Sequence, residues 1–227
     1  MVENSSQSVY VHQRPDLVIF DCDGVLVDSE LVSCQCLVDE LSGFGISLTL
    51  AQALELFLGR STSAVTQHYR ELGQAVPADF PVRLKSRVLT AFEKALHPIP
   101  DADTVLSGLR VPSCVASSSD LDRVALSLRV TGLAPHFGDR IYTAQMVTHG
   151  KPAPDLFLHA AEKMGALPAR TLVIEDSVSG VLAAKAAGMT VWGFVGGSHY
   201  RGRDGQVILS GAGADRVFAH MSDFWEA

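Results

Sequence analysis

The chain has 227 residues, of which 47% are hydrophobic and 19% charged, with a formal net charge of −7. This length suits one main core with a smaller inserted unit, and the composition is typical of globular proteins. The acidic balance argues against a nucleic-acid surface, and the apolar stretches are too short to span a bilayer. We expect no nucleic-acid partner and no membrane partner. A small anionic substrate is compatible, because local cations can reverse the sign inside one pocket.

The N-terminal segment and the cysteines are not expected to form a site. Residues 1–15 are polar and have no signal-type apolar region, so we expect a flexible tail. Cys22, Cys34, Cys36 and Cys114 form neither a paired zinc spacing nor a C-x-x-C redox motif. We expect buried, reduced thiols in a cytoplasmic protein.

The first predicted element is a strand at Leu17–Phe20, which is apolar and suited to a buried position in a sheet. After it, residues 30–97 contain no convincing strand but four helical patterns. These are Leu31–Leu41, Leu50–Phe57, Ser63–Leu72 and Val82–Ala95. A connection this long usually forms a unit of its own, so we expect an inserted all-helical cap domain at 30–97. The alternative is that these helices pack on the sheet within a single domain.

Strand and helix patterns alternate after residue 98. The strands are predicted at Ser113–Ala116, Arg140–Thr143, Thr171–Ile174 and Thr190–Phe194, and the helices at Leu121–Val130, Asp155–Met164 and Val178–Ala187. Gly132, Gly165 and Gly188 are placed to end these helices. The alternation predicts a doubly wound parallel α/β core, Rossmann-like, made of residues 16–29 and 98–227.

Two aspartates directly follow the first strand. Asp21 and Asp23 are two positions apart, so on an extended chain their side chains face the same way. Carboxylates this close repel each other unless a cation lies between them or one of them is protonated. One can then act as a nucleophile and the other as an acid and base. The alternative is a simple turn before Gly24.

Polar residues also follow two later strands. Glu175 and Asp176 end the strand at 171–174 and are oxygen ligands suited to Mg²⁺, although acids before a Ser177 cap also favour a helix start. Ser117 and Ser118 begin the turn after the strand at 113–116, where hydroxyl and N–H groups can hold a phosphate oxygen. The alternative for the serines is an ordinary loop.

Lys151 lies before two prolines in the segment Gly150–Asp155, which restricts its backbone. A lone lysine is normally a solvated surface charge. Ligands of open α/β sheets bind beyond the carboxyl ends of the strands, and the acids, serines and lysine all follow such ends. Together they supply what phosphoryl transfer needs, which is positioning and neutralisation of spread negative charge.

These motifs resemble, in order, those of the haloacid dehalogenase superfamily of phosphotransferases, over about residues 16–195. The chain is most similar to the β-phosphoglucomutase-like phosphatases, which carry a small helical cap between the first two motifs. The resemblance implies that Asp21 is the nucleophile, Asp23 the general acid and base, and that Ser117 and Lys151 hold the phosphate. It implies Mg²⁺ bound by the Asp21 carboxylate, the Asp23 backbone carbonyl and Asp176, with Glu175 direct or through water.

The resemblance also implies a substrate loop in the cap, at Gly59-Arg60-Ser61, with Arg60 reaching the substrate; the alternative is an exposed loop arginine. The mutases typically carry a histidine where this chain has Ser33. We therefore expect a phosphatase of a small phosphomonoester, such as a sugar or sugar-acid phosphate. Separately, we expect a monomer. A phosphomutase with the same intermediate is the second candidate. A receiver module that accepts a phosphoryl group on aspartate is a third, disfavoured by the long insert.

Overall fold

The structure, a computed structural model, describes residues 14–225, so residues 1–13 of the expected tail lie outside its description. The strands are β1 (Leu17–Phe20), β2 (Ser113–Ser117), β3 (Ile141–Thr143), β4 (Thr171–Glu175), β5 (Thr190–Phe194) and β6 (Arg216–Phe218). They form one parallel sheet in the order β3-β2-β1-β4-β5-β6. The predicted doubly wound parallel sheet is confirmed, and β1 lies in its interior between β2 and β4.

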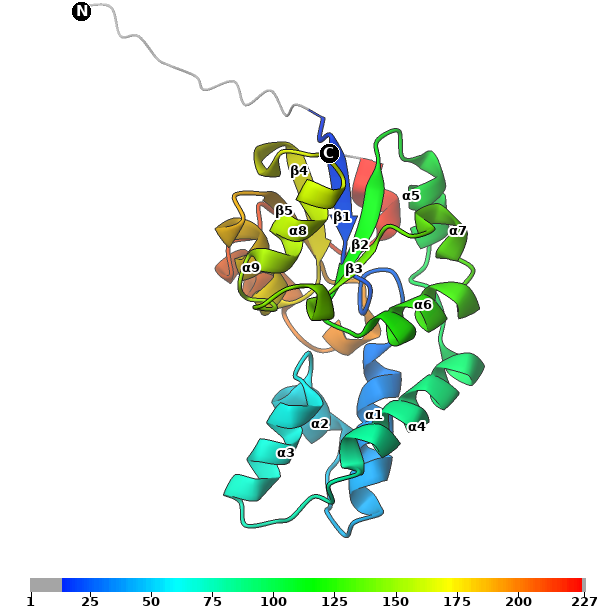
Figure 1. The fold of residues 1–227 in the computed structure, drawn as a ribbon, viewed down its shortest axis with the longest axis vertical. Coiled ribbons are helices and arrows are strands. Elements are labelled where there is room, and N and C mark those ends of the chain that lie inside the picture. Colours follow the sequence, from blue (N-terminus) through cyan, green and yellow to red (C-terminus); the bar gives the residue numbers. More distant parts are fainter. Residues whose placement is uncertain (1–13, 226–227) are drawn as a thin grey trace, which may run out of the picture.

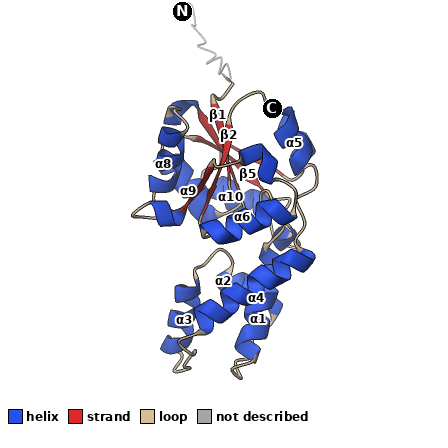
Figure 2. Ribbon diagram, turned by 45° about the vertical axis from the view of Figure 1, so that its right-hand side comes forward, coloured by secondary structure: helices blue, strands red, loops and turns tan. Residues whose placement is uncertain are grey.

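Helices cover both faces of the sheet (Figure 2). The helices of the core are α5 (Ala102–Gly108), α6 (Leu121–Val130), α7 (Ala134–Phe137), α8 (Asp155–Lys163), α9 (Val178–Ala186) and α10 (Gly205–Gly211). Short 3₁₀ helices lie at η1 (Ala144–Met146), η2 (Pro168–Arg170), η3 (Ser198–Tyr200) and η4 (Met221–Trp225). No helix among residues 14–225 is both long and apolar enough to cross a membrane.

Alternate residues of β1 enter two separate apolar cores because successive side chains of a strand point to opposite faces. Phe20 packs with residues of α5, α6 and α7, whereas Ile19 packs with residues of α8 and α9. Both side chains are fully buried. This explains why the strands are almost entirely apolar rather than alternating.

A helical cap follows β1. It consists of α1 (Glu30–Ser42), α2 (Leu50–Phe57), α3 (Thr62–Glu71) and α4 (Phe80–Ala95), which Figure 1 shows as a group of their own below the sheet. Its apolar core includes Leu41 and Phe80. Glu40 of α1, 2% exposed, accepts from Arg83 over 2.6 Å and from Arg87 over 2.8 Å, which joins α1 to α4. The helical cap is confirmed as part of the fold, while the limits 30–97 stay a prediction.

The cap leaves and re-enters the core at neighbouring points. Val27 forms an antiparallel bridge with Pro98, and the Asp28 N–H donates to the carbonyl of His97 over 3.0 Å. The two connections therefore run side by side, just beyond the carboxyl end of β1.

The sheet has one strand more than the sequence predicted. The extra strand, β6, has three residues, begins with an arginine and pairs only with β5 at the edge of the sheet. Helices α5, α7 and α10 were also not predicted, because they are only four to seven residues long. The glycines predicted to end α6, α8 and α9 are confirmed in their positive-φ conformation, with φ of 78° at Gly132, 68° at Gly165 and 72° at Gly188.

Candidate active site

The turn after β1 brings Asp21 and Asp23 to the carboxyl edge of the sheet. The Asp21 N–H continues the sheet pairing by donating to the carbonyl of Ile174 over 2.9 Å. Both aspartates are buried, at 7% and 8% exposure. Gly24 follows with a φ of 77°, and a Cβ atom there would lie 1.9 Å from Oδ2 of Asp176. Glycine is therefore required both by the backbone and by the close approach of a carboxylate.

Lys151 is brought into this edge from the loop after β3. Its side chain is 3% exposed, and Nζ donates to Oδ1 of Asp21 over 2.8 Å, to Oε1 of Glu175 over 2.5 Å and to the Ala116 carbonyl over 3.0 Å. Burial alone would lower the pKa of Lys151, but the carboxylates of Asp21 and Glu175 outweigh it and raise the pKa. Lys151 is therefore a fixed, buried cation rather than a solvated surface charge.

Glu175 ends β4 and Asp176 follows it, next to Asp21. Oε2 of Glu175 accepts from the N–H and from the hydroxyl of Ser177, each over 2.9 Å, while the same hydroxyl caps α9 by accepting from the N–H of Gly180. The predicted cap at Ser177 is confirmed, and it orients Glu175 at the same time. A Cβ atom at Gly180 would lie 1.8 Å from Oε1 of Glu175, so the helix backbone closely packs against this carboxylate.

Asp21, Glu175 and Asp176 can each offer a ligand oxygen to one cation, and these oxygens lie within 4.8 Å of one another. Burial is the main cause that raises the pKa of Asp21 and of Asp176 well above the usual value, and neighbouring carboxylates add to it. Together with Asp23 they form the carboxylate cluster of this site. The cations that contact it, the buried Lys151 and the partly buried Arg123, are fewer than its carboxylates. A divalent cation would balance the remaining negative charge, so the donor set fits a hard metal ion.

The carboxylate of Asp23 takes part in a separate hydrogen-bond network. Oδ1 accepts from the hydroxyl of Ser29 over 2.5 Å and from Nη2 of Arg123 over 2.8 Å, and Oδ2 accepts from the hydroxyl of Ser119 over 2.6 Å. Burial would raise the pKa of Asp23, but the Arg123 guanidinium and these hydrogen bonds outweigh it and lower the pKa. Without a bound cation, the pKa values of Asp23 and its neighbour Asp21 are thus pushed in opposite directions.

Asp176 is held from behind by the η3 segment. Nε2 of His199 lies 3.1 Å from Oδ2 of Asp176, and the hydroxyl of Tyr200 donates to the Asp176 carbonyl over 2.5 Å. His199 is 3% exposed, and its burial lowers the pKa, which favours the neutral ring. Nδ1 of His199 has no hydrogen-bond partner among the described residues, and Nε2 is the ring nitrogen that faces Asp176.

The two predicted serines lie differently. Ser117 is 1% exposed at the end of β2, and its hydroxyl accepts from the N–H of Ser119 over 3.1 Å. The carbonyl of the preceding residue, Ala116, binds Lys151, which places Ser117 beside the carboxylate cluster. Ser118 is exposed. The structure thus brings Asp21, Asp23 and Ser117 together with Lys151 and the acids of β4.

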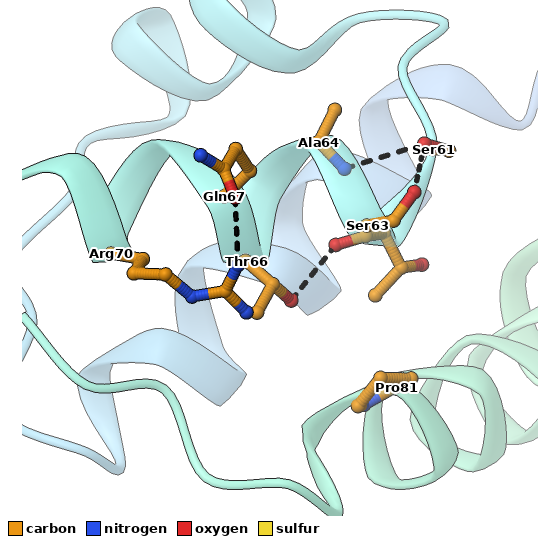
Figure 3. A pocket seen from close by; sticks show the side chains of 8 residues that line it. Ser61, Ser63, Ala64, Thr66, Gln67, Arg70 and Pro81 are labelled. Carbon is orange, nitrogen blue, oxygen red and sulfur yellow. Dashed lines mark hydrogen bonds between the residues drawn. The ribbon is translucent and has the colours of Figure 1, made fainter.

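The predicted cap residues are not brought into this group. Gly59 and Arg60 are exposed between α2 and α3, and the Arg60 side chain makes no hydrogen bond or ion pair within residues 14–225. Ser61 caps α3 by accepting from the N–H of Ala64 over 3.3 Å. It also lines a hollow of about 680 Å³ on the cap, which Arg70 lines too (Figure 3). No residue of the carboxylate cluster lines this hollow, so it is distinct from the candidate active site.

Arg123, Ser29, Ser119 and His199 were missed by the sequence analysis. Each is a single residue outside the recognised motifs, and its position depends on how distant segments pack. Only His199 carried a signal, because it follows the sequence Gly-Gly-Ser after a predicted strand. A lone loop histidine is more often structural, so that signal could not be separated from background.

Comparisons with known proteins agree with this geometry. Residues 15–188 match the model of a hydrolase family, described as haloacid dehalogenase-like hydrolase. The 6-phosphogluconate phosphatase of Escherichia coli (strain K12) is 29% identical over 82% of this chain and 85% of its own length. The fructose-1-phosphate phosphatase of the same strain is 32% identical over 79% of this chain and 96% of its own length.

Two solved structures support the same assignment. A HAD family hydrolase from Deinococcus radiodurans R1, with bound phosphate and sodium, has 38% sequence identity and a TM-score of 0.76 over 93% of this chain and 94% of that chain. A protein from Thermotoga maritima described as a putative β-phosphoglucomutase has 27% identity and a TM-score of 0.72, over 89% and 94%. The chain belongs to the haloacid dehalogenase-like hydrolase family.

Proposed function

We propose that the chain is a Mg²⁺-dependent phosphatase that hydrolyses a small phosphomonoester through an aspartyl-phosphate on Asp21. The observation that carries the proposal is the contact of Lys151 with both Asp21 and Glu175, at 2.8 and 2.5 Å. A buried cation fixed between two buried acids costs desolvation, which is best accounted for by a function that needs charge at this point.

In the proposed reaction, an Asp21 carboxylate oxygen attacks phosphorus, and the bond between phosphorus and the ester oxygen breaks. Asp23 donates a proton to the departing alkoxide. Asp23 then accepts a proton from a water molecule that attacks phosphorus, which breaks the bond to Asp21 and releases inorganic phosphate. Lys151 and the Ser117 hydroxyl would hold the phosphate oxygens, because they lie beside Asp21 at the same edge of the sheet.

Mg²⁺ would be held by Asp21 and Asp176, by the backbone carbonyl of Asp23, and by Glu175 directly or through water. When bound, the ion supplies positive charge that offsets the excess of carboxylates over cations in this site. His199 and Tyr200 orient Asp176 for this purpose.

The proposed substrate class is a sugar phosphate or sugar-acid phosphate. The names of the two relatives, a 6-phosphogluconate phosphatase and a fructose-1-phosphate phosphatase, support it. The exposed Arg60, at the start of the segment that leads into α3, is available to contact such a substrate from the cap. We expect a cytoplasmic monomer, and the four free, buried cysteines suit a reducing compartment.

The test is phosphate release from a panel of phosphorylated sugars and sugar acids that includes 6-phosphogluconate and fructose 1-phosphate. Release in the presence of Mg²⁺ is expected, with loss of activity in Asp21→Asn and after addition of a chelator. Asp23→Asn should lower turnover by about a hundredfold or more and leave Mg²⁺ affinity much less changed, since its metal contact is expected from the backbone. Full turnover by Asp21→Asn would disprove the covalent scheme.

Product analysis with β-glucose 1-phosphate separates hydrolase from mutase. A hydrolase releases inorganic phosphate, whereas a mutase forms glucose 6-phosphate. We expect the hydrolase outcome, because Ser33 stands where the mutases typically have a histidine, and here its hydroxyl binds Arg123 over 3.1 Å.

A further inference from the structure

Arg123 connects the proton-transfer carboxylate to the rest of the site. It lies in the first turn of α6, a helix of the core, and its side chain is 23% exposed. Nη2 lies 2.8 Å from Oδ1 of Asp23, whose side chain is 10% exposed. Arginine is costly to bury, and this one is directed at the carboxylate that the proposed function assigns to proton transfer.

The same guanidinium also contacts two helices of the cap. Nη2 donates to the hydroxyl of Ser33 in α1 over 3.1 Å. Its central carbon, Cζ, lies 5.0 Å from the centre of the Phe92 ring in α4. Arg123 therefore lies between Asp23 on one side and α1 and α4 on the other, so its position depends on where the cap lies.

Asp23 has two further hydrogen-bond partners, and they do not extend into the cap in the same way. Ser29 precedes α1 in the connection from β1, and Ser119 lies in the loop after β2. Arg123 is thus the partner of Asp23 that reaches across to α4. A role limited to stability would require a counter-ion for Asp23, but it would not require contact with two helices of the cap, α1 and α4.

We propose that Arg123 is a positioning residue that fixes the Asp23 carboxylate and makes its placement depend on the position of the cap. Proton transfer would then be efficient only when α1 and α4 hold the guanidinium in place. This inference rests on the proposed function, because it assumes that Asp23 donates a proton to the leaving group.

Arg123→Lys is the main test variant. It keeps the positive charge, but lysine lacks the planar guanidinium whose Nη2 binds the carboxylate and the hydroxyl while Cζ lies over the Phe92 ring. A small displacement of an acid is enough to slow proton transfer, so we expect the first chemical step to slow about tenfold or more for a sugar phosphate, with KM changed by less than about twofold.

The dependence on the leaving group separates positioning from a general structural effect. Nitrophenolate departs readily without a proton, whereas a sugar alkoxide requires one. In single-turnover measurements, Arg123→Lys should therefore slow the first step strongly with fructose 1-phosphate and by less than about threefold with p-nitrophenyl phosphate. Equal slowing with both substrates would overturn the inference.

Lys85→Gln is the matched control. Lys85 also joins α4 to α6, through ion pairs with Asp120 at 3.0 Å and Asp122 at 3.2 Å, but it does not contact Asp23. We expect Lys85→Gln to leave unchanged the ratio of the first-step rates with fructose 1-phosphate and p-nitrophenyl phosphate. If Lys85→Gln shifts this ratio of rates as Arg123→Lys does, then any loosening of α4 against α6 is enough to shift it, and Arg123 has no special role.

A double mutant distinguishes failure of this inference from failure of the proposed function. In the Asp23→Asn background, Arg123→Lys should cause no further slowing, because its effect passes through Asp23. If Asp23→Asn alone leaves the first step unchanged, the proposed role of Asp23 is wrong, and the inference falls with it. If Asp23→Asn is slow and Arg123→Lys multiplies the loss, the role of Asp23 stands and the inference about Arg123 is wrong.

Should Arg123→Lys fail to fold, as judged by circular dichroism, Ser33→Ala provides the second variant. It removes the hydrogen bond from the cap and leaves the contact between Arg123 and Asp23 intact. We expect the first step with fructose 1-phosphate to slow by less, about threefold, and the step with p-nitrophenyl phosphate to slow less again. If the ratio of first-step rates with the two substrates is unchanged in Ser33→Ala, the placement of Asp23 does not depend on the cap.

Discussion

Lys151 and Asp21 are 130 positions apart in the sequence, yet Nζ of Lys151 donates to Oδ1 of Asp21 over 2.8 Å. Replacing Lys151 with methionine should lower phosphate release by about a hundredfold or more, because the charge that faces the phosphate is lost. It should also destabilise the metal-free protein by about 3 kcal/mol or more, since Asp21 and Glu175 remain buried without their shared cation.

The control for this substitution is Lys185→Met. Lys185 pairs with Asp215 at 2.7 Å, but both side chains are about 40% exposed. An exposed pair contributes about 1 kcal/mol or less, so activity and melting temperature should hardly change. Phosphate release and thermal unfolding measure both effects, and equal losses in the two variants would contradict the role given to Lys151.

Gly180→Ala tests the packing of α9 against Glu175. The added Cβ would lie 1.8 Å from Oε1 of Glu175, so the carboxylate must move away from its present position. We expect a higher Mg²⁺ concentration for half-maximal phosphate release and a lower maximal rate. Gly211→Ala is the matched control, because the last position of α10 has open space for a Cβ and alanine favours helix by up to about 1 kcal/mol. Unchanged Mg²⁺ dependence in Gly180→Ala would show that Glu175 does not support the metal.

Glu30 is expected to make the stability of the folded chain depend on pH. Burial, with help from the negative charges of Asp23 and Asp176, raises the pKa of Glu30 from 4.5 to about 7. The folded chain then holds a proton that the unfolded chain has already released, so stability falls as pH rises from about 4.5 to about 7. The change is at most about 3 kcal/mol for this group.

Glu30→Gln removes this titration, so its melting temperature should fall less steeply than that of the wild type between these pH values. The measurement is thermal unfolding in the presence of a chelator. Glu162→Gln, at an exposed glutamate of α8, is the control and should keep the slope of the wild type. A parallel pH profile for Glu30→Gln and the wild type would exclude Glu30 as the source.

Arg60→Ala tests the proposed substrate contact from the cap. Arg60 is exposed and makes no contact that stabilises the fold within the described chain, so unfolding should be unchanged. We expect KM for the sugar phosphate to rise about tenfold, as for the loss of one charge-assisted hydrogen bond. Arg70→Ala, at the hollow beside α3, is the control and should leave KM unaltered. The opposite pattern would move the substrate contact to the hollow.

Much of the fold could be predicted because the strands are buried on both faces and therefore read as apolar runs. The five predicted strands are confirmed to within one residue at each end. The family and the phosphatase class were also predicted, and the family match and the relatives confirm them. Strand β6 could not be predicted, because three residues at an edge carry too little pattern to distinguish them from a loop.

The same reason decides which residues of the site could be predicted. Residues at the ends of apolar strands could be predicted, whereas residues placed by the packing of distant segments could not. Asp21, Ser117 and Glu175 each lie at the carboxyl end of a strand, and parallel strands place these ends at one edge, so their convergence follows from the strand pattern. Arg123 looks like an ordinary charged residue in the first turn of a helix. Its burial against Asp23 arises only when the cap packs on α6, and that packing is not encoded in any local sequence pattern.

The bridge between Val27 and Pro98 has a consequence for how this enzyme could be altered. Because the chain enters and leaves the cap at adjacent points, the whole helical unit is attached like a hairpin loop on an intact sheet. A unit of different size joined at the same two positions would also have to replace the contacts that Arg123 and Lys85 make between cap and core. The strands of the core therefore lie outside the inserted segment, while side chains such as Arg123 couple the two parts.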